Sequence, residues 1–215
     1  MPDDRPILWT PSPERAASTR IAGFERWLQD NRGLSFASYQ EMWEWSVTDL
    51  DGFWTALIAY CDLPVSGWTE VLPERKMPGA DWFPGAKTNM AAPMVGWARK
   101  KPSEQALICQ SETFGQLELS WEELEHKVGA LQATLRDMGV SQGDRVVAIL
   151  PNTPDAIISF FAVSGLGAIW SLCAPDMGHV AILDRFKQIE PKVLIAQDGY
   201  VHGGKTYDKR EIVEA

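Results

Sequence analysis

Residues 143–175, GDRVVAILPNTPDAIISFFAVSGLGAIWSLCAP, decide the fold of this 215-residue chain. They read as a buried strand over 145–150, a helix begun by Thr153-Pro154, and a second apolar strand over 168–173. Proline suits the first helical position because its missing N–H would have no partner there. A strand, a helix and a strand in this order predict two parallel strands joined by a right-handed crossover.

The segment before this unit carries a hairpin and a helix signal. Residues 106–110 and 116–120 alternate as two short strands around a turn, which is typical of a β-hairpin. Ser120 and Glu123 form a Ser-x-x-Glu capping box, which predicts a helix that Gly139 ends.

The segment after it continues the alternation, with a helix expected over 178–189 and a strand over 193–196. The fold class predicted is therefore α/β, with a parallel doubly wound sheet and flanking helices. We place this domain at residues 96–215.

Residues 1–95 have a different composition and predict a Trp-rich helical and irregular segment. Eight of the ten tryptophans lie at or before Trp97. Short helices are expected near residues 23–28, 39–46 and 53–60, because apolar side chains recur there at helical spacing. Proline and glycine crowd residues 64–93, so that stretch is expected to be irregular, with its tryptophans serving as packing anchors.

Composition and charge exclude several classes. The net charge of −9 removes the electrostatic driving force for nucleic acid or an anionic membrane surface. Three dispersed cysteines form neither a metal pattern nor a disulfide scaffold, and no secretory signal is visible, so we expect a cytoplasmic protein. Residues 156–175 lack charge, but two glycines interrupt them and prolines bracket them. A buried helix and strand explain this stretch better than a membrane span.

Ligands of parallel sheets collect beyond the carboxyl ends of the strands. Three loops qualify, at residues 151–153, at 174–178 and after Ala196. The first reads as a helix cap. In the third, Gly203-Gly204-Lys205 allows two interpretations: a flexible basic turn that meets a phosphate, or a solvated turn with an exposed lysine, which spacing alone favours.

No catalytic or metal-binding constellation can be read from the sequence. The three histidines, His126, His179 and His202, are scattered, and neither a Gly-x-Ser-x-Gly elbow nor a complete Gly-x-x-x-x-Gly-Lys-Ser/Thr loop occurs. We therefore predict no catalytic residue and no metal ligand within these residues.

An ordered set of segments nevertheless resembles the acyl-adenylate-forming ligases, and among them the acetoacetyl-CoA synthetase family. The most specific segment is GAIWSLCAPD at residues 167–176. The others, in order, are residues 82–86, Asn89, and residues 143–146, 150–152, 184–189, 191–194, 198–200 and 203–205.

The resemblance implies a two-step reaction in which acetoacetate and Mg-ATP give an acyl-adenylate and CoA then takes the acyl group. It implies that CoA lies against Ala174, Pro175 and Asp176 and against the turn of His202, Gly203, Gly204 and Lys205. His202 stands where the acetyl-CoA synthetases place arginine. Neutral imidazole is a poorer phosphate partner than arginine.

The resemblance also implies that this is the first part of an AMP-binding ligase N-terminal domain. The Ser/Thr/Gly-rich phosphate loop, the acyl pocket and the C-terminal domain with its catalytic lysine are not found in these residues, so we expect an N-terminal fragment that is inactive alone. Two alternatives stay open: a non-catalytic CoA-binding or protein-interaction module, and a fragment of another short-chain acyl-CoA synthetase. The strand over 193–196 is expected at an exposed sheet edge, which predicts self-association.

Overall fold

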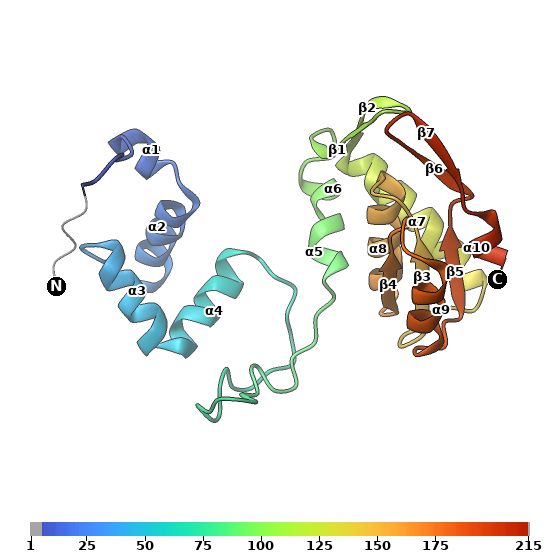
Figure 1. Cartoon of the computed structure of the whole chain (residues 1–215). Helices are drawn as coiled ribbons and strands as arrows, with labels where there is room; N and C mark the ends of the chain where they lie inside the picture. Colours follow the sequence, from blue (N-terminus) through green and yellow to red (C-terminus); the bar gives the residue numbers. More distant parts are fainter. Residues whose placement is uncertain (1–5, 215) are drawn as a thin grey trace. The chain divides into compact units, whose positions relative to one another are not determined.

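The computed structural model describes residues 6–214 and divides into two compact units, one up to Thr88 and one from Asn89. Each unit is described by itself (Figure 1). The helices of the first unit are α1 (Pro13–Ala17), α2 (Arg20–Arg32), α3 (Tyr39–Thr48) and α4 (Leu50–Tyr60).

Side-chain caps start all four of these helices. Ser12, Thr19, Ser38 and Asp49 each accept a hydrogen bond from a backbone N–H in the first turn of the helix that follows. Such caps satisfy amide groups that have no partner within the helix. The three helices expected from apolar spacing are confirmed as α2, α3 and α4, which exceed the predicted ranges by seven, two and three residues.

The core of the first unit is small and ringed by aromatic side chains. Its buried members are Phe24, Leu28, Met42 and Ala56. Around them the rings lie in stacked, tilted and edge-to-face pairs, and most of these rings are only half-buried. Aromatic pairs of this geometry contribute beyond their buried area.

The irregular stretch that follows α4 uses two tryptophans as anchors, as the sequence predicts. Trp82 packs edge-to-face on Trp54 of α4, with ring centroids 5.8 Å apart. Trp68 makes the same kind of contact with Phe83 at 5.7 Å. The rings therefore hold the stretch where no regular helix or strand does.

Two glycines allow this stretch to fold back on itself. Ser66 and Lys87 exchange backbone hydrogen bonds in an isolated antiparallel bridge. Beside it, a Cβ on Gly67 would come within 3.1 Å of the Gly85 carbonyl oxygen, and a Cβ on Gly85 within 3.0 Å of the Gly67 carbonyl oxygen. Both glycines also have positive φ, so larger residues would be strained twice over.

The second unit contains the predicted α/β fold. Its helices are α5 (Ala91–Val95), α6 (Trp97–Lys100), α7 (Trp121–Asp137), α8 (Pro154–Gly165), α9 (His179–Lys187) and α10 (Arg210–Glu214). Its strands are β1 (Gln105–Ser111), β2 (Gly115–Ser120), β3 (Arg145–Ile149), β4 (Ile169–Cys173), β5 (Val193–Ala196), β6 (Gly199–His202) and β7 (Lys205–Asp208).

The central sheet is parallel, with the order β4-β3-β5. In register, Val147 of β3 lies opposite Ser171 of β4 on one side and Leu194 of β5 on the other. The hairpin of β1 and β2, the capping box at Ser120 and the strand–helix–strand unit of β3, α8 and β4 are confirmed.

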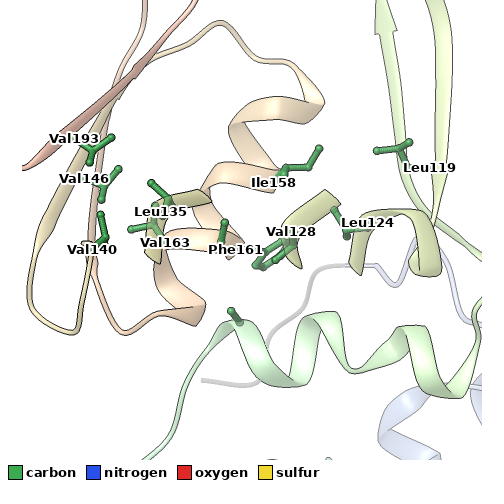
Figure 2. Packing of buried hydrophobic residues seen from close by; sticks show 12 residues of the cluster. Leu119, Leu124, Val128, Leu135, Val140, Val146, Ile158, Phe161, Val163 and Val193 are labelled. Atoms are coloured by element: carbon green, nitrogen blue, oxygen red, sulfur yellow. The ribbon is translucent and has the colours of Figure 1, made fainter. Parts of the chain in front are cut away.

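Alternate residues of β3 face opposite layers, which makes the sheet doubly wound. Val146 packs with α7 and α8, where Leu135 and Val163 are among its neighbours in the larger core cluster. Figure 2 shows these side chains converging from the sheet and both helices. Val147 belongs to a different cluster, with Ile182 of α9, on the other face. Burial on both faces explains why β3 is apolar at each position from Val146 to Ile149 rather than alternating.

The amino end of the sheet is closed by two basic side chains. Arg145 donates to the carbonyl oxygens of Ile189 at 2.7 Å and Glu190 at 2.8 Å. Lys192 donates to the Gly139 carbonyl oxygen at 2.5 Å and to the Asp144 carboxylate at 3.0 Å. These bonds tie the loops that enter β3 and β5 to each other.

The compact units divide earlier than the predicted boundary at residue 95. Helix α5 packs on α8 and so belongs to the second unit. Just before α5, the Asn89 side chain donates to the Ser164 carbonyl oxygen at 2.8 Å and accepts from the Ala91 N–H. One side chain thus starts α5 and fixes it on the end of α8.

The structure adds one element pair that we did not predict. The stretch after Ala196, taken from the sequence as a loop, contains strands β6 and β7 in an antiparallel hairpin. The uncharged stretch before Asp176 is a helix and a strand, as expected, and α8 is largely buried. The expected burial of the strand is wrong: β4 lies at an edge of the three-stranded sheet, and Ile169 and Leu172 are 52% and 43% exposed. No helix within residues 6–214 is long and apolar enough to cross a membrane.

Candidate functional site

A pocket of about 870 Å³ opens at the carboxyl ends of β3 and β5. Its walls come from four segments: the turn between β1 and β2, the loop that follows β3, the segment from the end of β5 into β6, and strand β7 with the start of α10. They contribute Gln110–Phe114, Pro151–Thr153, Gln197–His202, Thr206–Asp208 and Arg210. This is the end of a parallel sheet at which ligands collect.

Thr153 lies in this wall at the first residue before α8. It occupies the cap position predicted from the sequence, but its side chain makes no cap hydrogen bond. Its hydroxyl oxygen is buried and has no hydrogen-bond partner within the described chain. A buried hydroxyl without a partner carries a desolvation cost, so Thr153 is a polar group that a pocket ligand or water would satisfy.

Two tyrosines form the wall on the β6–β7 hairpin. Tyr200 and Tyr207 face each other across the strands and stack with ring centroids 5.0 Å apart. The Lys209 ammonium lies 5.7 Å from the centre of the Tyr200 ring. The pKa of Tyr200 is raised, first by partial burial and then by the negative charge of Asp176 and by Tyr207.

A carboxylate and a guanidinium pair at the start of α10. Arg210 donates to Asp208 through its side chain and its backbone N–H. These hydrogen bonds lower the pKa of Asp208 to about 2, so the carboxylate is ionised at neutral pH. The two charges largely compensate each other in this part of the wall.

The Gly203-Gly204 pair is the two-residue turn of the β6–β7 hairpin. Both glycines have positive φ, 59° and 71°, as the tight turn that best matches strand twist requires. Their backbone N–H groups donate to the two carboxylate oxygens of Glu112, at 2.9 and 2.8 Å. Glu112 comes from the turn between β1 and β2, so its carboxylate joins the tips of two hairpins.

The structure brings the two halves of the predicted site toward the same sheet end without merging them. Ala174 and Asp176 are exposed and Pro175 is buried, in the loop between β4 and α9. His202 and Lys205 are exposed and lie opposite each other at the base of the Gly-Gly turn. His202 lines the pocket, whereas the 174–176 loop reaches its neighbourhood only through the charge of Asp176 on Tyr200.

Three residues of this region were missed by sequence reasoning: Glu112, Tyr200 and Tyr207. A signal existed for the tyrosines, because residues 199–208 alternate about a Gly-Gly pair in a manner typical of a hairpin. Glu112 gave none, because its partners lie 91 and 92 positions along the chain. Across residues 6–214, the histidine, cysteine and carboxylate side chains form no cluster that could hold a metal ion.

Comparison with known proteins assigns both units. Residues 95–214 match the AMP-binding enzyme family, and residues 39–93 match the acetyl-coenzyme A synthetase N-terminus family.

Full-length relatives give the same result. The chain is 39% identical to an acetoacetyl-coenzyme A synthetase of Rhizobium meliloti over 216 aligned residues, which cover 100% of this chain and 33% of the relative. It is 32% identical to the acetoacetyl-CoA synthetase of Gallus gallus, over 95% of this chain and 31% of the relative. The solved acetoacetyl-CoA synthetase from Streptomyces lividans superposes with a TM-score of 0.88 at 42% identity, over 96% of this chain and 32% of that one.

The chain belongs to the AMP-binding enzyme family, whose match covers more than half of it. The parallel sheet with flanking helices is the N-terminal domain fold of these ligases, so the predicted fold class is confirmed. Within the family, the chain is similar to the N-terminal region of acetoacetyl-CoA synthetases, and it spans about a third of the length of the relatives it matches.

Proposed function

We propose that this chain is the N-terminal part of an acetoacetate–CoA ligase. The observation that carries the proposal is the similarity to acetoacetyl-CoA synthetases over essentially the whole chain, in sequence and in fold. In the proposed reaction, acetoacetate attacks the α-phosphorus of Mg-ATP, and pyrophosphate leaves. The CoA thiolate then attacks the acyl carbon of the adenylate and releases AMP.

Within that enzyme we assign this chain a part of the CoA nucleotide site rather than the reacting atoms. The residues proposed are Ala174, Pro175, Asp176 and the turn from His202 to Lys205. The support is their placement at the carboxyl end of the sheet and the presence of two backbone N–H groups and an ammonium group on one exposed turn. Such groups suit a phosphate.

The fit to CoA has one weak point and one obstacle. By the resemblance to acetyl-CoA synthetases, His202 stands at the position of an arginine, and a neutral imidazole would give the turn less positive charge. In addition, the two turn amides already donate to Glu112. A CoA phosphate would have to replace that carboxylate.

We propose that the 215 residues do not complete the reaction alone, since they include no Ser/Thr/Gly-rich phosphate loop. The test is ATP–pyrophosphate exchange with acetoacetate, run on the purified chain beside a full-length ligase as positive control. The expected result is exchange at the buffer rate. Acetoacetate-dependent turnover by the chain alone would overturn the proposal of inactivity.

Calorimetry with CoA tests the nucleotide site. Lys205→Ala is expected to weaken CoA binding by about fivefold, because it removes one exposed phosphate-facing charge. Lys187→Ala, which removes an equal charge from the exposed side of α9, is the matched control and should bind like the unaltered chain. Equal binding by both variants would remove Lys205 from the site.

Two other functions are separated from the first by simple measurements. A non-catalytic CoA-binding or interaction module would bind CoA or a protein partner with no ligase sequence encoded downstream. A ligase for another short acyl chain would carry the downstream phosphate loop but prefer a different acid. Sequencing the DNA after the codon for Ala215, then assaying any longer product with acetoacetate and acetate, distinguishes all three. A cytoplasmic location stays a prediction, tested by fractionation.

A further inference from the structure

The backbone amides at the tip of the β6–β7 hairpin bind a carboxylate of the same chain, that of Glu112. Each carboxylate oxygen of Glu112 accepts one backbone N–H, from Gly203 at 2.9 Å and from Gly204 at 2.8 Å. A carboxylate that accepts two successive amides is bound in the manner of a small external anion.

The turn is shaped for this task by its two glycines. Positive φ at both central residues makes consecutive N–H groups point to the same side, and this conformation is open to glycine at no steric cost. A Cβ at either position would meet no atom within 4 Å, so the space around the turn is open. The two amides, which Glu112 occupies, therefore belong to an exposed turn with open space beside its glycines.

Glu112 is held there by little besides these two bonds. It is the first residue of the turn between β1 and β2, and both it and the glycines are exposed. Hydrogen bonds to exposed carboxylates contribute modestly to stability because water competes for both partners. An anion from solution can thus reach the same two amides without the unit unfolding.

We propose that Glu112 is an internal competitor for phosphate at the Gly203-Gly204 turn. A ligand phosphate would bind the two amides only after displacing the Glu112 carboxylate, and the displaced carboxylate would then repel it. Glu112 therefore sets the phosphate affinity of the turn. This inference uses the proposed function only for the identity of the natural ligand, a CoA phosphate. The anion site itself rests on the turn and its resident carboxylate.

The charges near the turn favour an anion once Glu112 is neutralised. Lys205 and His202 flank the glycines at the base of the hairpin, and Arg210 is neutralised by its bond to Asp208. Replacement of the Glu112 carboxylate by an amide leaves a single acceptor for the two turn N–H groups, beside the Lys205 ammonium. The gain should appear with any small phosphate, including one with no nucleotide.

The direct test follows the Gly203 and Gly204 amide resonances of the ¹⁵N-labelled chain during titration with inorganic pyrophosphate. Glu112→Gln keeps the side-chain size and removes the charge and one acceptor. Glu118→Gln is the matched control, because it removes an equal charge from the same hairpin, where Glu118 contacts Gln105 and Gln116 instead. The expected result is pyrophosphate binding at least about tenfold tighter in E112Q than in E118Q or the unaltered chain.

Several outcomes would overturn the proposal. These are equal affinity in all three proteins, binding in none of them, or a gain in E112Q without movement of the two glycine resonances. Loss of the hairpin in E112Q, seen as loss of the cross-strand contacts between the Tyr200 and Tyr207 rings, would also count against it. A carboxylate that the hairpin needs to fold cannot be one that a ligand displaces.

A second titration, with CoA and with dephospho-CoA, separates this inference from the proposed function. If E112Q gains affinity for pyrophosphate but for neither CoA compound, the internal competitor stands and the assignment of the turn to CoA fails. If E112Q gains affinity for neither pyrophosphate nor CoA while CoA still binds the unaltered chain, the competitor is refuted and CoA binding is retained. A gain for CoA that exceeds the gain for dephospho-CoA would support both and identify the 3′-phosphate as the group bound.

Discussion

The core cluster of the first unit packs four buried residues among aromatic rings, whereas the second unit buries mostly aliphatic side chains between a sheet and its helices. In the first, Phe24 contacts the rings of Trp27, Phe53 and Tyr60, none of which is fully buried. In the second, Val146 and Ala148 are completely shielded from solvent. The difference shows two ways to stabilise a chain: ring geometry among short helices, and close packing across layers.

This contrast predicts that one truncation in the second unit costs more than one in the first. Leu135→Ala removes a fully buried side chain from α7 and should destabilise the unit by about 3 kcal/mol, because the closely packed layers cannot collapse into the space. Amide hydrogen exchange of β3 measures it. Arg136→Ala, at the exposed neighbouring position, is the control. A loss no larger than that of the control would contradict the contrast.

The matching change in the first unit is Phe24→Leu. Leucine keeps most of the buried area but loses three ring contacts, so we expect a loss of about 1 kcal/mol. Urea unfolding followed by tryptophan fluorescence is a suitable measurement, since Trp27 stacks on Phe24. Tyr39→Leu, at an exposed position of α3, should leave the midpoint unchanged. A larger loss for F24L than for L135A would reverse the comparison.

The loop before β3 in the second unit contributes to stability in a way that depends on pH, through Asp144. Hydrogen bonds from the Ser141 backbone N–H, the Lys192 ammonium and the Ser141 hydroxyl lower the pKa of Asp144 from 3.8 to about 2. A lowered folded-state pKa contributes stability that is complete above the unfolded pKa and is lost as pH falls from about 4 to about 2.

Asp144→Asn should therefore lower stability at neutral pH and flatten its pH dependence within that window. The measurement is the urea midpoint between pH 2 and pH 7, with Asp137→Asn as the control carboxylate. If the D144N and D137N profiles coincide, the Asp144 contacts carry no stability.

The smallest effect on folding is expected at the edge of the sheet. An exposed edge strand can pair with another molecule, and the helices of the first unit offer no such edge. β5 is an edge of the central sheet within the described residues, and Leu194 on it is 39% exposed. Leu194→Lys should change the free energy of unfolding by no more than about 0.5 kcal/mol and should reduce any self-association. Light scattering across a concentration series checks this. If the unaltered chain is already a monodisperse monomer, the prediction of self-association through β5 is wrong.

Much of the fold could be predicted because its signals are local. The capping box at Ser120, the proline at the start of α8 and the uninterrupted apolar run of β3 each lie within a few residues of what they determine. The hairpin of β6 and β7 was not predicted although its pattern is present, because Gly203-Gly204 was interpreted as a phosphate turn or a solvated turn and not as the connection between two strands.

The candidate site could be predicted only in part, because its residues come from distant segments. The location at the carboxyl end of the sheet follows from topology alone. The Glu112 contact cannot be predicted in this way, because nothing in the turn between β1 and β2 indicates which amides will meet it. The low pKa of Asp208, in contrast, depends on Arg210 two residues away and is a local effect.

The hydrogen bonds of Arg145 and Lys192 hold together the loops at the amino end of the central sheet. These side chains bind carbonyl groups of the loops that precede β3 and β5, so changes there break contacts that hold strands in place. The loops that follow β3 and β4, at the opposite end, take no part in these bonds. A library of insertions after Leu150 or Ala174 should therefore yield folded variants far more often than one before Arg145. Changes in the loops after β3 and β4 would leave the bonds of Arg145 and Lys192 at the amino end of the sheet in place.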